Sequence, residues 1–338
     1  MKKSLLALAV LSAFAGAASA QSSVTLSGGV DVSIEYQNED WNMGRGNSGR
    51  SNFTLSGTED LGGGMRAFFL LNYRFAASDG TTTSQPETGR FWRQSWVGLG
   101  GRFGEVRLGR MLPTLQIYNG DFDPFGTETI GSTHTGGLNA GLAGSSRVNN
   151  NILYVSPNLG GLTFHANVAA GDQNGPIVGT TQTNGTERPM GLGVYYSAGP
   201  LRLAAAYDSN GLDGKTTGLY GSFNAGFATI MGQWENGDCG PLAFPANGVS
   251  SCGAGTTTDV TIWSIGARIP FGAATAKVGY RSSSDLEQKK MAAGLDYSLS
   301  KRTIVYTDVA KQSGDGFRGA AGDRAEKVRF DVGVWHKF

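Results

Sequence analysis

Residues 327–338 read KVRFDVGVWHKF and close the chain on an aromatic side chain. Apolar side chains occupy every second position of this stretch, at Val328, Phe330, Val332 and Val334, and polar or small residues stand between them. A β-strand places alternate side chains on opposite faces, so this period predicts a strand with one apolar and one polar face. Such a strand suits a wall that has lipid on one side and water on the other.

The other end of the chain has the pattern of an export signal. Lys2 and Lys3 form a basic start, residues 5–14 an apolar run, and residues 18–20 (Ala-Ser-Ala) a cleavage site. The alternative, a transmembrane anchor, needs a longer apolar run that does not end in small residues. We therefore predict a signal peptide over residues 1–20 and one exported domain over residues 21–338.

The composition narrows the class of protein. Glycine supplies 53 of the 338 residues, well above the usual ~7%, whereas the 10 prolines are too few for collagen. The formal net charge of +1 gives no reason to expect nucleic-acid binding. After residue 20 no stretch approaches the ~18 apolar residues of a membrane helix. A mean hydropathy of −0.20 still allows a transmembrane barrel, because half of each strand faces water.

The two cysteines, Cys239 and Cys252, lie close together in a stretch rich in Gly, Pro and Asn. An exported chain meets an oxidising compartment, so we predict a disulfide that closes one loop. Two free thiols are the alternative. A metal site is not expected, because no histidine lies near these cysteines.

Sixteen amphipathic segments follow one another after the signal, and short turns alternate with long loops between them. Their even number, their length and this alternation are typical of outer-membrane barrels. A soluble β-sandwich has no need of such a strand count. The fold predicted is an all-β, 16-stranded antiparallel transmembrane barrel with short periplasmic turns and long extracellular loops. The predicted strands lie near residues 24–36, 50–60, 65–77, 89–100, 104–111, 147–157, 161–171, 188–198, 200–210, 215–224, 226–236, 258–269, 272–283, 286–299, 303–311 and 327–338.

Several ordered motifs resemble the general diffusion porins of β-proteobacteria, including the anion-selective members of that family. They are GTEDLGGG at residues 57–64, RQSWVGL at 93–99, FGEVRLGR at 103–110, RVNNN at 147–151 and LSKRT at 299–303. The resemblance covers essentially the whole exported chain and is weakest in the long loops.

The resemblance implies a homotrimer in the cell outer membrane, with one pore per subunit for small ions and solutes. It also implies that the third extracellular loop, here residues 112–146, folds inward and narrows the channel. A long surface loop is the alternative for that segment. The terminal Phe338 resembles the signal that the outer-membrane assembly machinery reads. Outer-membrane lipid and lipopolysaccharide are the expected surroundings.

A predicted constriction combines basic side chains of the wall with carboxylates of the inward loop, which would give a transverse field that favours anions. In the anion-selective relatives, arginines line the constriction, and Arg93 and Arg147 match two of those positions. Asn52 stands where relatives often carry arginine, and Arg50, two residues away, is expected on the same face. The alternative for each base is a solvated charge with little influence on conduction. The full predicted set is Arg50, Asn52, Arg66, Arg74, Arg93, Arg107, Arg147, Asp121, Asp123 and Glu128.

Strand parity assigns further charged side chains to the water-filled side of the barrel. The bases are Arg202, Lys277, Arg281, Lys290 and Arg329, and the acids are Asp31, Glu35, Asp208, Glu235, Asp259, Asp296 and Asp331.

The sequence gives no reason to expect an enzyme or a cofactor. The histidines are His134, His165 and His336, and the chain has no G-x-S-x-G context and no histidine fixed on a strand beside a serine. Two other functions stay open. A substrate-specific channel with a saturable binding site needs an aromatic ladder along the pore, which the parity does not provide. A surface adhesin or structural barrel would act through its long loops.

Overall fold

The computed structural model describes residues 22–37, 40–44, 46, 50–82, 91–126, 129–133, 147–170, 174–178, 181–184, 188–209, 214–238, 259–285, 287–314 and 327–338. The predicted signal peptide, Glu128, Cys239, Cys252 and His134 lie outside the described residues.

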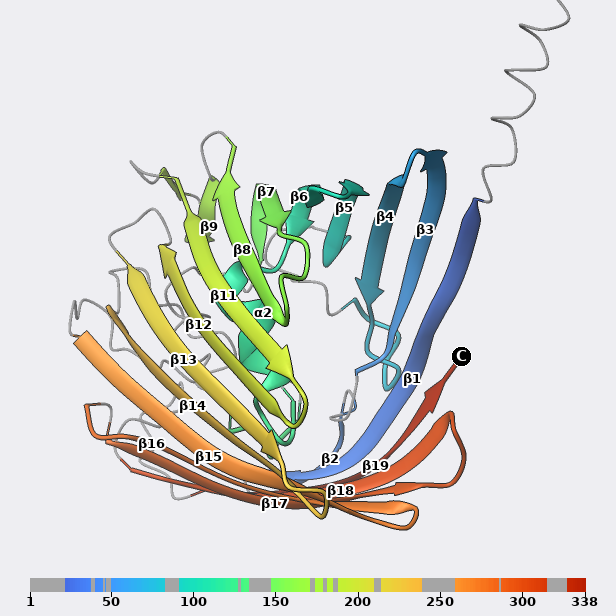
Figure 1. The fold of residues 1–338 in the computed structure, drawn as a ribbon. Coiled ribbons are helices and arrows are strands. Elements are labelled where there is room, and N and C mark those ends of the chain that lie inside the picture. The colour runs from blue at the N-terminus through green and yellow to red at the C-terminus, as the bar shows by residue number, and fades with distance from the viewer. Residues whose placement is uncertain are drawn as a thin grey trace, which may run out of the picture.

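One antiparallel sheet closes on itself, because β1 pairs with β19 at one side and with β3 at the other (Figure 1). β2 and β3 pair with successive stretches of β1 and share one place in the ring, so the 17 strands of the sheet form a 16-stranded barrel. This confirms the predicted fold class. The strands are β1 (Ser23–Gln37), β2 (Asp40–Gly44), β3 (Asn52–Gly62), β4 (Met65–Arg74), β5 (Gln94–Gly101), β6 (Gly104–Met111), β7 (Val148–Val155), β8 (Leu162–Ala169), β11 (Met190–Ala198), β12 (Leu201–Ser209), β13 (Lys215–Asn224), β14 (Thr229–Asp238), β15 (Asp259–Phe271), β16 (Ala274–Ser283), β17 (Gln288–Ser298), β18 (Thr303–Ser313) and β19 (Lys327–Lys337).

Closure removes the unpaired backbone groups that an open sheet edge would expose to lipid. The side chains follow the alternation that the sequence predicted. On β1, Val24 and Leu26 are 67% and 61% exposed on the outer face, whereas Asp31 and Ser33 are 0% and 2% exposed on the inner face. The apolar period of β19 therefore continues on the neighbouring strand, and Val332 lies opposite Ile34 in the register.

The turns at one end of the barrel are short, and we call this the short-turn end. Gly62, Gly63 and Gly64, between β3 and β4, have φ angles of 79°, 61° and 80°. These left-handed values favour glycine, so the tight predicted turn depends on this run. At the opposite end, called the long-loop end, the strands are joined by longer segments, including the one between β6 and β7.

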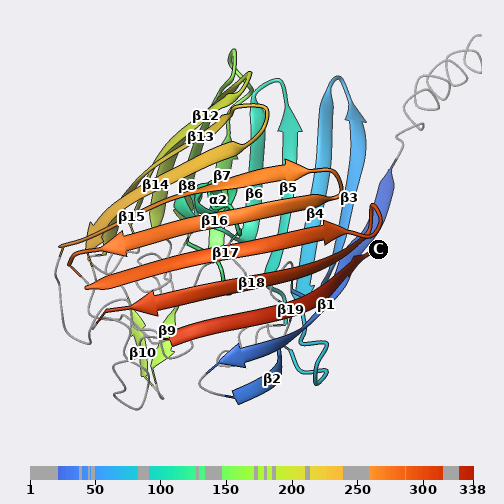
Figure 2. The same cartoon turned by 90° about the horizontal axis from the view of Figure 1, so that it is seen from below.

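Four elements were not predicted. β2 lies between the first two predicted strands. β9 (Asn174–Val178) and β10 (Thr181–Asn184) form a separate two-stranded sheet within a predicted loop. Helix α2 (Thr114–Asp121) lies within the segment after β6 and contacts β11 and β12 (Figure 1). Figure 2 also shows it inside the ring of strands. Among the described residues, no helix has the length and apolar character needed to cross a membrane.

Candidate pore constriction

Helix α2 is fixed to the barrel wall at its N-terminus. The residue before it, Pro113, offers no side-chain cap, and the first N–H groups of a helix lack partners within the helix. The wall supplies them. Asn167 Oδ1 accepts hydrogen bonds from the Thr114 backbone N–H at 3.2 Å and from the Thr114 hydroxyl at 2.7 Å. Asp208 Oδ2 accepts the Leu115 N–H at 3.0 Å. A carboxylate at this position also interacts favourably with the positive end of the helix dipole.

The apolar face of α2 packs on the inside of the barrel. Leu115, Tyr118 and the following Phe122 are buried together in one cluster. Their wall partners are Ala204, Ala206 and Tyr220. The helix approaches the wall closely at Gly193. A Cβ added there would lie 2.5 Å from Thr114 and 2.7 Å from Tyr118. No helix was predicted here, although the spacing of the apolar residues of α2, three and four apart, is a pattern that can indicate one.

A buried polar clasp joins the middle of α2 to β14. Asn119 Nδ2 donates to Glu235 Oε1 at 2.7 Å, and the Tyr220 hydroxyl donates to the same oxygen at 2.7 Å. Gln233 Nε2 donates to the Asn119 carbonyl at 3.1 Å. The exposed fraction of all four residues is 4% or less. Glu235, which parity placed on the inner face, therefore holds the inward segment in place.

Asp123 organises the segment that follows α2. Its carboxylate accepts hydrogen bonds from the Phe125 N–H at 3.0 Å, the Ser132 hydroxyl at 2.7 Å and the Thr133 N–H at 2.9 Å. Asp123 is 2% exposed. This geometry favours a structural role for Asp123, and its part in ion selectivity stays a prediction.

Further along the chain, carbonyl groups of the same segment accept hydrogen bonds from basic side chains of the wall. Arg268 Nε on β15 donates to the Pro124 carbonyl at 2.6 Å, and Lys290 Nζ on β17 donates to the Ser132 carbonyl at 2.6 Å. Lys277 Nζ lies 5.2 Å from the centre of the Phe125 ring. The inward segment thus covers the wall from β8 to β17 with its own backbone.

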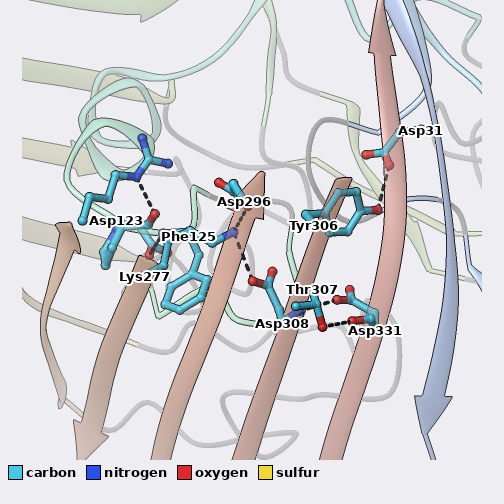
Figure 3. Close-up of polar contacts among 11 residues, drawn as sticks. Asp31, Asp123, Phe125, Lys277, Asp296, Tyr306, Thr307, Asp308 and Asp331 are labelled. Carbon is cyan, nitrogen blue, oxygen red and sulfur yellow. Dashed lines mark hydrogen bonds and ion pairs between the residues drawn. The ribbon is translucent and has the colours of Figure 1, made fainter. Parts of the chain in front are cut away.

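Lys277 also joins two carboxylates of the neighbouring strands, as Figure 3 shows. Its Nζ lies 2.6 Å from Asp296 Oδ1 and 3.0 Å from Asp308 Oδ1. The next acids in the ring serve as structural acceptors. Tyr306 donates its hydroxyl to Asp31 at 2.7 Å, and the Asp308 N–H bonds Asp331 Oδ1 at 2.9 Å (Figure 3).

The wall that α2 leaves uncovered carries the predicted arginines. Arg147 stands directly before β7 and is 7% exposed. Arg93 stands before β5, and its backbone N–H bonds the Asn72 carbonyl of β4. Asn52 accepts a hydrogen bond from Asn72 Nδ2 at 3.5 Å. Arg74 ends β4 beside Asn52 in the register.

Strand parity does not decide the direction of two arginines. Arg110 was missed: a register shift between Gly109 and Met111 turns it inward, where it is 8% exposed and donates to Asn149. Arg50 lies outside β3 and has a φ of 52°, so the alternation of β3 does not set its direction. Its backbone N–H bonds Asp31 Oδ2 at 2.9 Å.

Arg66 and Arg107 lie at a different height on the barrel. Both bond Glu105, which directly follows the turn between β5 and β6. The structure therefore places Arg66 and Arg107 side by side near the short-turn end, away from Arg93 and Arg147.

Asp121 is the last residue of α2, at the helix end that a carboxylate does not favour. Its side chain is exposed, but the surrounding protein removes part of the hydration of the carboxyl and raises its pKa, and the charge of Arg202 on β12 opposes that rise. The surroundings of Asp121 therefore shift the pH at which this predicted loop carboxylate loses its charge.

Comparisons with known proteins agree on one family. The model of the family described as Gram-negative porin matches residues 7–316. The chain is 35% identical to outer membrane porin protein 32 of Delftia acidovorans, over 92% of this chain and 89% of that protein. Among solved structures, the anion-selective porin from Comamonas acidovorans is 27% identical, with a TM-score of 0.75, and the match covers 94% of this chain and all of that one. OmpT of Vibrio cholerae in its trimer form has a TM-score of 0.66 at 13% identity, over 94% of this chain and 99% of that one.

Proposed function

Because this chain belongs to the Gram-negative porin family, whose members lie in the outer membrane, we propose that it is a passive diffusion pore that favours small hydrophilic anions. Solutes cross by diffusion, and the protein performs no chemical step. The relatives to which it is similar are porins rather than enzymes.

The observation that carries the proposal is the path of the inward segment. It covers the wall from β8 to β17, where the amine of Lys290 and the guanidinium of Arg268 bond its carbonyls. Arg93, Arg110 and Arg147 lie on the wall at β5 to β7. In a narrow channel with low-dielectric walls, a group of cations lowers the barrier for anions.

Under this proposal the members of the predicted constriction set have different weights, and Arg66 and Arg107, which bond Glu105 near the short-turn end, do not belong to the constriction. Arg93 and Arg147 carry the selectivity, and Arg110 joins them because the bulge of β6 turns it inward. Asn52 reduces the positive charge relative to relatives with arginine there. Asp121 and Glu128 oppose the arginines from the loop, and Arg50 and Arg74 add charge at the long-loop end.

The test is the reversal potential of single channels in a planar bilayer under a KCl gradient. The wild-type protein should prefer chloride, and the Arg93→Ala, Arg147→Ala double variant should lose most of that preference. The Arg102→Ala, Arg302→Ala double variant is the matched control, because both arginines are exposed in short turns. Preference for potassium in the wild type would sink the anion proposal. Negligible conductance would favour a surface adhesin or structural barrel.

We further propose a homotrimer with its short turns in the periplasm, assembled through recognition of Phe338 and exported through the signal at residues 1–20. The trimer form of OmpT supports the stoichiometry as an analogy. Conductance steps in groups of three and a heat-sensitive oligomer on a gel are expected. A Cys239–Cys252 disulfide predicts that a reducing agent shifts the migration of the heated, unreduced protein.

A further inference from the structure

A compact group of charged and aromatic side chains lies on the inner wall near the short-turn end. It consists of Arg66 and Phe68 from β4, Trp96 from β5, and Glu105 and Arg107 from β6. We call it the guanidinium–aromatic cluster. The constriction described above does not use it.

The guanidinium groups lie over the aromatic rings. Arg107 Cζ is 5.1 Å from the centre of the Trp96 ring and 5.9 Å from that of Phe68, and Arg66 Cζ is 5.4 Å from the Phe68 ring. The two rings meet edge to face, with centres 5.8 Å apart and an interplanar angle of 83°. Stacking holds each planar guanidinium in one orientation, so less side-chain freedom is lost when it binds an anion.

The wall beneath the cluster is built from glycines. A Cβ on Gly98 would lie 2.8 Å from the Phe68 ring, and a Cβ on Gly100 would lie 3.1 Å from Arg66 Cζ. Both glycines face the inside of the barrel, because Val97 and Leu99 between and beside them are exposed on the outer face. The ring and the guanidinium therefore lie flat against β5, and the barrel side of the cluster stays open to the channel.

The cluster has an excess of positive charge. Glu105 Oε1 accepts from Arg66 Nη2, and Glu105 Oε2 accepts from Arg107 Nε at 3.2 Å and Nη2 at 2.6 Å. One carboxylate thus serves two guanidiniums, each of which has five N–H groups. The side chains of Arg66 and Arg107 are 47% and 29% exposed. N–H groups beyond those that Glu105 occupies can reach a solute in the channel.

We propose that the guanidinium–aromatic cluster is a second solute-binding site, which takes aromatic carboxylates on their way through the pore. The carboxylate bonds the guanidinium edges of Arg66 and Arg107, and the solute ring packs edge to face against the parts of Phe68 and Trp96 that the guanidinium groups leave uncovered. This proposal rests on the pore function and deepens it by naming a class of solute. Glu105 competes with the solute for the same N–H groups and keeps binding weak enough for release.

The experiment measures binding directly, by titration calorimetry of the folded protein in detergent. In parallel, the block of single-channel current by the same probes is recorded. The probes are benzoate, cyclohexanecarboxylate, which has the charge and size without the aromatic ring, and acetate, which has the charge alone. The wild type should bind benzoate most tightly and acetate least. The Trp96→Leu variant should lose most of the preference for benzoate over cyclohexanecarboxylate. Trp263→Leu is the matched control, because Trp263 is exposed on the outer face of β15.

Two further variants distinguish a loss of binding from a loss of folding, because they are expected to change the affinity in opposite directions. Glu105→Gln removes the competing charge, so benzoate should bind several-fold more tightly, whereas Arg66→Gln should weaken binding by about tenfold, which corresponds to one lost charge-assisted contact. Equal affinity for benzoate and cyclohexanecarboxylate, or weaker binding in Glu105→Gln, would overturn the site. A wild type that conducts KCl but shows no benzoate preference keeps the pore and loses the site. Binding without KCl conductance removes the pore and keeps the cluster as a binding site.

Discussion

Asn119 and Glu235 stand 116 positions apart in the chain and meet at 2.7 Å inside the barrel. This bond joins the inward helix to β14, and both side chains are fully buried. The width of the channel therefore depends on a buried contact between a loop and a strand, and can change without any change in the number of strands.

Glu235→Ala is expected to loosen the inward segment. The substitution leaves the Asn119 amide and the Tyr220 hydroxyl buried without their acceptor, at a cost of about 1–3 kcal/mol for each unsatisfied group. The barrel itself persists, so single-channel current should become larger and noisier and larger sugars should enter proteoliposomes faster. Asp259→Ala, an exposed carboxylate at the start of β15, is the control. Unchanged current in Glu235→Ala would mean that the apolar contacts of α2 alone hold the segment.

Gly193→Val tests the close approach of α2 to the wall. The first added carbon already falls 2.5 Å from Thr114, and overpacking of this kind costs about 1–3 kcal/mol. We expect displacement of α2 and altered conductance with little loss of barrel stability against heat. In Gly221→Ala, the added Cβ meets only Leu203, at 3.5 Å. Conductance should stay at the wild-type value there, and an equal change in both variants would contradict a role for this contact.

The two faces of the strands were predictable because lipid on one side and water on the other make apolar and polar side chains alternate along each strand. The outer Val24 and the inner Asp31 lie where the alternation put them. The alternation gives the face of a side chain, but not its height along the barrel. For this reason Arg66 and Arg107 were grouped with Arg93, although they lie with Glu105 near the short-turn end.

The inward helix could not be placed from the sequence because its partners are distant in the chain. Asn167 and Asp208 cap it, 53 and 93 positions after the residues they bond. Arg110 was missed for a local reason: one extra residue in β6 reverses the face, and nothing in the motif at residues 103–110 marks the shift.

The charge of Asp121 should make ion selectivity depend on pH. Partial loss of hydration raises the pKa of this carboxyl above its usual value, so it takes up a proton at a pH at which carboxylates with an unperturbed pKa are still ionised. A falling pH therefore removes the negative charge of Asp121, and the preference for anions should rise. Reversal potentials measured from pH 7 down to about pH 4, the region where unperturbed carboxylates titrate, report this step.

Asp121→Asn should remove that step. The amide carries no charge at any pH, so the variant should show at neutral pH the stronger anion preference that the wild type reaches only in acid. Asp60→Asn is the matched control, because Asp60 lies exposed at the short-turn end and accepts the Gly62 N–H. If Asp121→Asn keeps the full pH dependence of the wild type, another carboxylate controls the field. Glu128, the remaining loop acid of the predicted constriction, is then the residue to replace next.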